Sequence, residues 1–134
     1  MNRLIDMKIG EVLNEISLEP VSRIDLIKYA GASGDFNPIH TIDKEATKAG
    51  LPGIIAHGMW TMGNLSKLFT PYLEEGFIQD YKIRFADMVF LDDVITLKAV
   101  LDEVHENYLD FDVMAVKANG KVAIKGNVRF KIYQ

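Results

Sequence analysis

One stretch near the middle of the chain is apolar on almost every side. It runs from Ile54 to Phe69, IIAHGMWTMGNLSKLF, and Pro71 follows it. A helix that is apolar almost all round has to be buried, so the remaining elements must wrap around it. We expect this helix to begin near Gly58 and to end at Pro71, because proline lacks the backbone donor that continues a helix.

The second half of the chain has the alternating pattern that is typical of β-strands. Apolar and polar residues alternate in four segments, which cover residues 78–85, 94–104, 108–117 and 122–133. The last two segments flank Ala118-Asn119-Gly120, and Asn-Gly between two strands predicts a hairpin with a type I′ turn. Together with the buried helix, these strands predict an α+β domain in which one curved antiparallel sheet wraps around a long central helix.

The N-terminal third carries the signals of a helix start and a helix stop. Ser22 and Asp25 have the spacing of a capping box, which predicts a helix over residues 23–32. Gly34 is a suitable stop, because glycine readily adopts the left-handed conformation that ends many helices. The residues expected to face the core are Ile24, Ile27 and Ala30.

Two further segments precede the buried helix. Residues 7–20 alternate loosely and predict either a short first strand or an extended segment. Residues 43–48 have a helical pattern, and Asp43 at its start suits the positive end of a helix dipole.

Composition excludes several classes of function. With 134 residues, of which 49% are apolar, we expect a single domain over residues 1–134 with a substantial hydrophobic core. The net charge of -4 argues against a nucleic-acid partner. The chain has no cysteine, so it offers neither a disulfide nor a thiolate, and three histidines without cysteine disfavour a structural zinc site.

The N-terminus and the apolar runs bear on location. The segment MNRLIDMKIG lacks the long apolar run and the small-residue cleavage site of a signal peptide. No stretch approaches the ~20 apolar residues of a membrane helix. We therefore expect a cytoplasmic protein without membrane insertion.

A tight turn, SGDFNPIH, ends at His40 and contains an acid five residues earlier. Gly34 permits left-handed backbone angles, and Pro38 keeps Asn37 out of the helical region. Asp35 and His40 could therefore face one small volume, where a carboxylate and an imidazole that share a water form an acid–base pair. The alternative is that Asp35 only caps the turn and His40 packs beside it.

Gly58 stands where the buried helix is expected to begin, in His57-Gly58-Met59. The first N–H groups of a helix have no intrahelical partner, and they carry the positive end of the helix dipole. Because glycine has no side chain, a ligand oxygen could approach the backbone there. This arrangement is typical of an oxyanion site.

The turn Ser33-Gly34-Asp35-Phe36-Asn37-Pro38-Ile39-His40, followed by Ile55-Ala56-His57-Gly58-Met59, resembles the hydratase motif of the MaoC-like family. That family comprises (R)-specific enoyl-CoA hydratases and 3-hydroxyacyl-thioester dehydratases with the hot-dog fold. The resemblance is specific from about Ser22 to Phe69, and beyond Thr70 only the strand rhythm is similar. It implies that this chain is a hot-dog hydro-lyase.

The resemblance implies roles for three residues. Asp35 and His40 match the catalytic pair that holds the water added to C3 of a trans-2-enoyl thioester, or removed from an (R)-3-hydroxyacyl thioester. Gly58 matches the glycine whose N–H binds the thioester carbonyl, where negative charge develops. The division of proton transfer between Asp35 and His40 stays open. The implied substrate is an acyl thioester of CoA or of acyl carrier protein, with no cofactor and no metal.

Four other residues are candidates for binding the substrate or shaping the site. Ser66 matches a serine that related hydratases carry on the central helix, although its hydroxyl could instead bond the helix's own carbonyls. Trp60 could line an acyl tunnel or anchor the core. We interpret His57 as shaping the start of the helix rather than transferring protons, and Asn37 belongs to the catalytic turn.

The segment from Phe85 to Asp93 departs from the family pattern. Many relatives have Pro and Gly-Asp there, whereas this chain has Met88 in place of the proline and Asp92 in place of the glycine. Aspartate tolerates turn conformations, so the fold is not threatened. The departure leaves open the shape of a pocket or interface near this loop.

Two other functions are alternatives to the hydro-lyase. A hot-dog thioesterase commonly places an acid on or beside the central helix, and the absence of Asp and Glu from residues 58–69 counts against it. An acyl-binding subunit without chemistry of its own is disfavoured by the presence of both Asp35 and His40.

A second subunit is expected. A single small sheet leaves edge strands exposed, and the resemblance implies that two sheets pair edge to edge with sites near the interface. We therefore expect a homodimer. A heteromer with another hot-dog subunit is the alternative, because the run Ala49-Gly50-Leu51-Pro52-Gly53 also resembles dehydratases that work with a partner chain.

Overall fold

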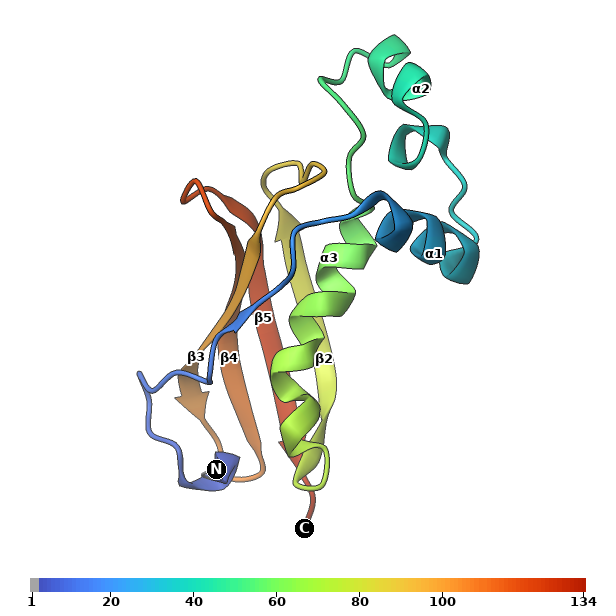
Figure 1. Ribbon diagram of the computed structural model, residues 1–134. Helices are drawn as coiled ribbons and strands as arrows, with labels where there is room; N and C mark the ends of the chain where they lie inside the picture. The colour runs from blue at the N-terminus through green and yellow to red at the C-terminus, as the bar shows by residue number, and fades with distance from the viewer. Residues whose placement is uncertain (1–2) are drawn as a thin grey trace.

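A five-stranded antiparallel sheet curves around a central helix in the computed structural model, which describes residues 3–134 (Figure 1). The strands lie side by side in the order β1-β3-β4-β5-β2. Their bounds are β1 (Ile16–Ser17), β2 (Gly76–Phe85), β3 (Ile95–Val104), β4 (Tyr108–Lys117) and β5 (Val122–Ile132). The predicted α+β arrangement is confirmed, and the four predicted strand segments agree with β2 to β5 to within two residues at each end.

The central helix is shorter as an α-helix than the sequence predicts. Helix α3 covers Gly58–Leu65, and the chain continues as a tighter 3₁₀-helix, η3, over Ser66–Tyr72. Pro71 lies inside η3 and does not end it, so the expectation that the proline stops the helix is wrong. The reason is local, because η3 is held by i to i+3 bonds such as Leu73 N–H to Thr70 O (3.4 Å), which need no donor from Pro71.

The core lies between the inner face of the sheet and the helical run. Leu65 and Phe69 on this run are completely buried. The ring of Phe69 lies 5.1 Å from that of Phe111 on β4 and 5.9 Å from that of Phe130 on β5. These aromatic contacts anchor α3 and η3 against the middle of the sheet.

The hairpin between β4 and β5 forms where predicted, but with another turn. A type I′ turn needs a positive φ at both central residues, and within residues 3–134 Asp92 is the only non-glycine residue with positive φ. Gly120 has φ 87°, and its N–H bonds the carbonyl of Lys117 (2.9 Å). The loop is therefore a three-residue turn that ends on a left-handed glycine. A register shift follows in β5, between Val122 and Ile124.

Helix α1 (Arg23–Ser33) has the predicted caps. The Ser22 hydroxyl accepts from the Asp25 N–H, the Asp25 carboxylate accepts from the Ser22 N–H, and Gly34 ends the helix with φ 76°. The predicted inward face is wrong in part, because Ile24 and Ile27 are 53% and 45% exposed whereas Leu26 and Ala30 are buried. Helix α1 lies at the N-terminal end of α3 rather than on the sheet, so only a narrow face is covered (Figure 1).

Short elements complete the N-terminal half. Residues 7–20 run as an extended segment whose only strand is β1, and Val12 adds an isolated bridge to Val100 on β3. The remaining helices are η1 (Leu4–Asp6), η2 (Pro38–His40) and α2 (Asp43–Lys48), the last with its predicted bounds. Among residues 3–134, no helix has both the length and the apolar character needed to cross a membrane.

A buried lysine fastens the loop between β2 and β3. The Lys117 ammonium, 7% exposed, donates to the carbonyl of Met88 (2.8 Å) and lies 3.3 Å from a carboxylate oxygen of both Asp87 and Asp93. In the same loop Asp92 has φ 68°, the left-handed conformation for which glycine is the usual residue. The loop therefore keeps its turn although the family glycine is replaced by aspartate.

Candidate active site

Local hydrogen bonds hold the turn after α1 in one shape. The N–H of Asp35 donates to the Ser33 hydroxyl (3.2 Å), and the N–H of Asn37 donates to Asp35 Oδ1 (3.2 Å). The Asn37 side chain in turn accepts from the N–H of Ile39 (3.3 Å). Because Oδ1 of Asp35 is used by the turn, its other carboxylate oxygen, Oδ2, is the one free to face a ligand.

The side chains of Asp35 and His40 face each other at a distance that one water molecule can bridge. His40 is 8% exposed, and its Nδ1 lies 2.7 Å from the carbonyl of Ile55. A carbonyl only accepts, so Nδ1 carries the proton and donates, which leaves Nε2 to face Asp35. Nε2 lies 3.9 Å from Asp35 Oδ2, too far for a direct hydrogen bond and suitable for a water that bonds both.

His57 supports this pair from behind. Its ring stacks on that of His40 at 3.8 Å and meets the ring of Tyr29 edge-on at 4.8 Å. Its Nε2 donates to the backbone carbonyl of Asp35 (3.1 Å), and its buried Nδ1 has no hydrogen-bond partner among residues 3–134. Burial lowers the pKa of His57, against the opposing effect of the bond to the Asp35 carbonyl, so the imidazole is held neutral.

Helix α3 begins at Gly58, which lies directly against the aromatic ring of Phe85. A Cβ atom built on Gly58 would lie 2.6 Å from a ring atom of Phe85, the last residue of β2. A larger residue fits there only if the exposed Phe85 ring moves aside.

Two cavities meet at Gly58 and Phe85, which line both. The outer chamber, about 430 Å³, is lined in addition by Tyr29, Ser33, Asp35, His57 and Met59. The inner chamber, about 190 Å³, is lined in addition by residues that include His40, Ala56, Thr61, Met88, Val89 and Ile124. Asp35 lines the outer chamber and His40 lines the inner one, so the pair stands where the two chambers meet.

Gly58, Asp35, His40 and His57 are brought together as the sequence suggests, but two other candidates are not. Within the described residues, Trp60 and Ser66 line neither chamber. Trp60 follows Gly58 by two residues, which turns it about 200° around the helix, and it lines a groove beside Ser17 instead. The Ser66 hydroxyl donates to the carbonyl of Gly63 (2.6 Å), the helix-bonded alternative.

Asn37 also stands apart from the cavities. It is exposed, caps η2 and shapes the turn through its side chain and its N–H. Its place in the structure is therefore that of a residue that holds Asp35 in position.

Thr61 and Phe85 are among the residues of the inner chamber that the sequence did not suggest. Thr61, 2% exposed, lies one helical turn after Gly58, and an i, i+3 spacing from the glycine is the signal that could have found it. Phe85 continues the inward alternation of Tyr81 and Ile83, but its contact with Gly58 depends on how β2 lies against α3.

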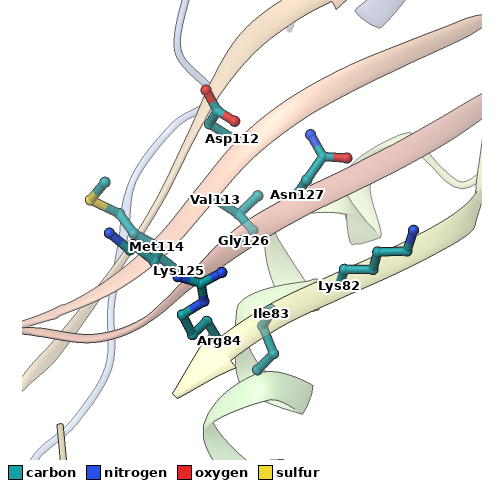
Figure 2. A pocket seen from close by; sticks show the side chains of 9 residues that line it. All are labelled: Lys82, Ile83, Arg84, Asp112, Val113, Met114, Lys125, Gly126 and Asn127. Atoms are coloured by element: carbon teal, nitrogen blue, oxygen red, sulfur yellow. The ribbon is translucent and has the colours of Figure 1, made fainter. Parts of the chain in front are cut away.

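A larger hollow, about 570 Å³, lies elsewhere. It is an open groove over β2, β4 and β5, where Lys82 points away from the side to which Ile83 projects (Figure 2). Arg84 and Lys125, which are paired in register, gather at one end of it. Among the described residues that line the groove there is no imidazole, so the chambers at Gly58 are the better candidate site.

Asp35, His40 and His57 have donor atoms within 4.8 Å of one another, as metal ligands do. The hydrogen bonds oppose that use, however. Nε2 of His57 is protonated because it donates to a carbonyl, and its Nδ1 is enclosed, so His57 has no lone pair to offer an ion in the cavity. The group fits a water better than a metal.

Comparisons with known proteins identify the family of the chain. The family model described as MaoC like domain matches residues 6–122. The chain belongs to the MaoC-like family. An (R)-hydratase structure from A. caviae superposes with a TM-score of 0.87 at 20% identity, over 96% of this chain and 98% of that one. The hot-dog fold expected from the sequence is therefore confirmed.

Sequence relatives match shorter parts of the chain. The 3-hydroxyacyl-thioester dehydratase X of Mycobacterium tuberculosis is 38% identical over 68 residues, 48% of this chain and 22% of that protein. The fatty acid synthase subunit beta of Aspergillus oryzae is 37% identical over 79 residues, 56% of this chain. The chain matches only 4% of the length of that synthase subunit, so the MaoC-like domain is a small part of it.

Proposed function

We propose that this MaoC-like domain catalyses the reversible hydration of trans-2-enoyl thioesters to (R)-3-hydroxyacyl thioesters. The observation that carries the proposal is the 3.9 Å gap between Asp35 Oδ2 and His40 Nε2, beside the N-terminus of α3. Two relatives support the reaction class by their names, one a hydratase and one a dehydratase.

The mechanism follows from what each group can do. A water between Asp35 and His40 donates one hydrogen bond to each acceptor, which aims its oxygen lone pair at C3 of the enoyl group. One member of the pair takes a proton as the C3–O bond forms, and a proton is delivered to C2. Both groups contact the same water, so we assign the transfer to the pair.

The thioester carbonyl is placed at the start of α3. As water adds to C3, negative charge moves onto the carbonyl oxygen to give an enolate. The Gly58 N–H, at the positive end of α3, donates to that oxygen and lowers the barrier. Position 58 carries no side chain of its own, so the carbonyl approaches this N–H beside the Phe85 ring that lies against Gly58.

Substitution of the pair tests the proposal. We expect Asp35→Asn and His40→Ala each to reduce hydration of crotonyl-CoA by roughly a hundredfold or more, within or above the range of positioned acid–base catalysis. Because both groups act on one water, the double variant should be little slower than the slower single variant. Matched controls are Asp102→Asn and His105→Ala, which remove an exposed acid and an exposed imidazole far along the chain from the pair.

The assay has three readouts. They are the loss of the enoyl absorbance, the configuration of the hydroxyl product, and the release of free thiol. Hydration by a normally folded Asp35→Asn variant at the unmodified rate would contradict the proposal and favour a binding subunit. Thiol release in place of hydration would favour the thioesterase.

We propose further that the chain works with a second hot-dog subunit, either a copy of itself or a related chain, and acts on thioesters of CoA or of acyl carrier protein. The support is the long edge of β2, which pairs with β5 on one side and with no other strand among residues 3–134 on its other side.

A further inference from the structure

The inner chamber has a closed end and an exposed rim. Four of the residues around it are almost completely buried, which closes it on the side of the core: Ala56, Thr61, Val89 and Ile124. Phe85 and Met88, by contrast, are 56% and 44% exposed. A ligand therefore enters past these two side chains and ends against the buried wall.

The volume of the chamber limits what it can hold. At about 190 Å³ it is only slightly larger than the cavity of about 150 Å³ that takes up one benzene molecule in another protein. It therefore has room for about six carbon atoms, less whatever the reacting water occupies. A longer chain has no continuation into the core, because the fully buried Phe69, Phe111 and Phe130 fill the space between η3 and the sheet.

The walls also limit the chemistry of the ligand. His40, Thr61 and Asp87 are three polar side chains in the lining. The Lys117 ammonium holds Asp87 and lowers the pKa of its carboxyl, so a carboxylate stands at the chamber wall. An extended hydrocarbon would lie against these groups, whereas a short chain meets mainly Ala56, Val89 and Ile124.

Phe85 controls the passage between the two chambers. Its ring lies against Gly58, so a thioester carbonyl that bonds the Gly58 N–H must lie beside the ring or displace it. The carrier arm then lies in the outer chamber with Asp35, and the acyl chain lies in the inner chamber with His40.

We propose that the inner chamber is an acyl pocket for short trans-2-enoyl chains of about four to six carbons, and that Phe85 is the residue that sets this limit. The inference rests on the proposed hydratase function and adds the substrate class to it. The ring lines both chambers beside Gly58, so it narrows the space through which a longer chain would pass.

The experiment compares chain-length profiles. For the unmodified chain, kcat/KM is measured with the CoA thioesters of trans-2-butenoic, hexenoic, octenoic and decenoic acids. We expect the butenoyl or hexenoyl thioester to be best, and the decenoyl thioester to be slower by about tenfold or more, because a chain that overfills a pocket loses affinity with each added carbon.

Phe85→Ala should raise the decenoyl-to-butenoyl ratio of kcat/KM by about tenfold or more, because it joins the two chambers. Phe85→Leu, which keeps an apolar side chain, should raise it less and guards against a folding defect in the alanine variant. Phe77→Ala is the matched control. Phe77 is another exposed phenylalanine of β2 and stacks on Tyr133 at 5.8 Å, so its removal should leave the ratio unchanged.

The outcomes separate the two proposals. If no chain length is hydrated, the hydratase function itself fails. If the unmodified chain hydrates decenoyl thioester as well as butenoyl thioester, the short-chain pocket is overturned. If both Phe85 variants fold and keep the original ratio, Phe85 does not set the limit and that assignment is overturned.

Discussion

At the scale of single residues, the stacked rings of His40 and His57 determine how the candidate pair is presented. Each ring donates to a backbone carbonyl, His40 to Ile55 and His57 to Asp35, and both tautomers are fixed by these bonds. The neutral ring of His57 stacks on His40 without adding a charge. We infer from these contacts that His57 is a positioning residue for Asp35 and His40.

The lowered pKa of His57 predicts a pH dependence of stability. As the pH falls below 6.5, the unfolded chain takes up a proton on His57 before the folded chain does, so folding stability decreases until the folded pKa is reached. The groups that face the ring are Asp35, His40 and Tyr29. This residue contributes at most about 1.4 kcal/mol per pH unit.

Urea unfolding at about pH 7.5 and about pH 5.5 measures the effect. The free energy of unfolding should fall less between these values for His57→Gln than for the unmodified chain. His105→Gln, which removes an exposed histidine, should keep the original dependence. An unchanged pH dependence in His57→Gln would show that the ring titrates normally in the folded protein.

At the scale of elements, the loop between β2 and β3 connects the sheet to the site. Lys117 holds the loop, and the loop carbonyl of Val89 accepts from the N–H of Ala56 (2.8 Å). The neighbouring carbonyl of Ile55 is the one that fixes His40. A buried ammonium on β4 thus supports, through three backbone segments, the orientation of the catalytic candidate.

Lys117→Met should lower the free energy of unfolding by about 3 kcal/mol, because it leaves Asp87 and Asp93 without their shared cation. This loss of unfolding free energy is near the lower end of the range for broken buried ion pairs, because both carboxylates keep some contact with water. Urea denaturation gives the value. The matched control is Lys125→Met on the exposed face of β5, and an equally small loss in both variants would mean that Lys117 does not fasten the loop.

At the scale of the whole molecule, the fold ends in an exposed edge. Strand β2 is ten residues long and stands at the end of the sheet, with Phe77 and Phe85 exposed. A long edge strand with apolar side chains readily pairs with another strand. The candidate site lies at the same edge, since Phe85 lines both chambers.

We therefore expect the purified chain to form at least a dimer. Light scattering at assay concentrations should give at least twice the chain mass of 15.1 kDa. A mass of 15.1 kDa that rises only when a second hot-dog subunit is added would point to the heteromer. A persistent monomer that is fully active would rule out any need for a partner.

The sequence alone determined the features that depend on neighbouring residues. Four features depend only on residues that are close together in the chain. They are the capping box of α1, the bounds of α2, the strand alternation of β2 to β5, and the turn that carries Asp35. Hydrogen bonds and periodicity act at this range, so the residue types are sufficient to predict them. The apolar helix at Gly58 likewise required a sheet around it.

Only the tertiary structure decided which surfaces meet. Contacts between residues far apart in the chain decide four features of this protein. They are the exposure of Ile24, the direction of Trp60, the contact of Phe85 with Gly58, and the surroundings of Lys117. Local patterns carry no information about the relative placement of α1, α3 and β2. The chemical groups of the candidate site are thus readable from the sequence, whereas its two chambers exist only because the end of β2 lies across the start of α3.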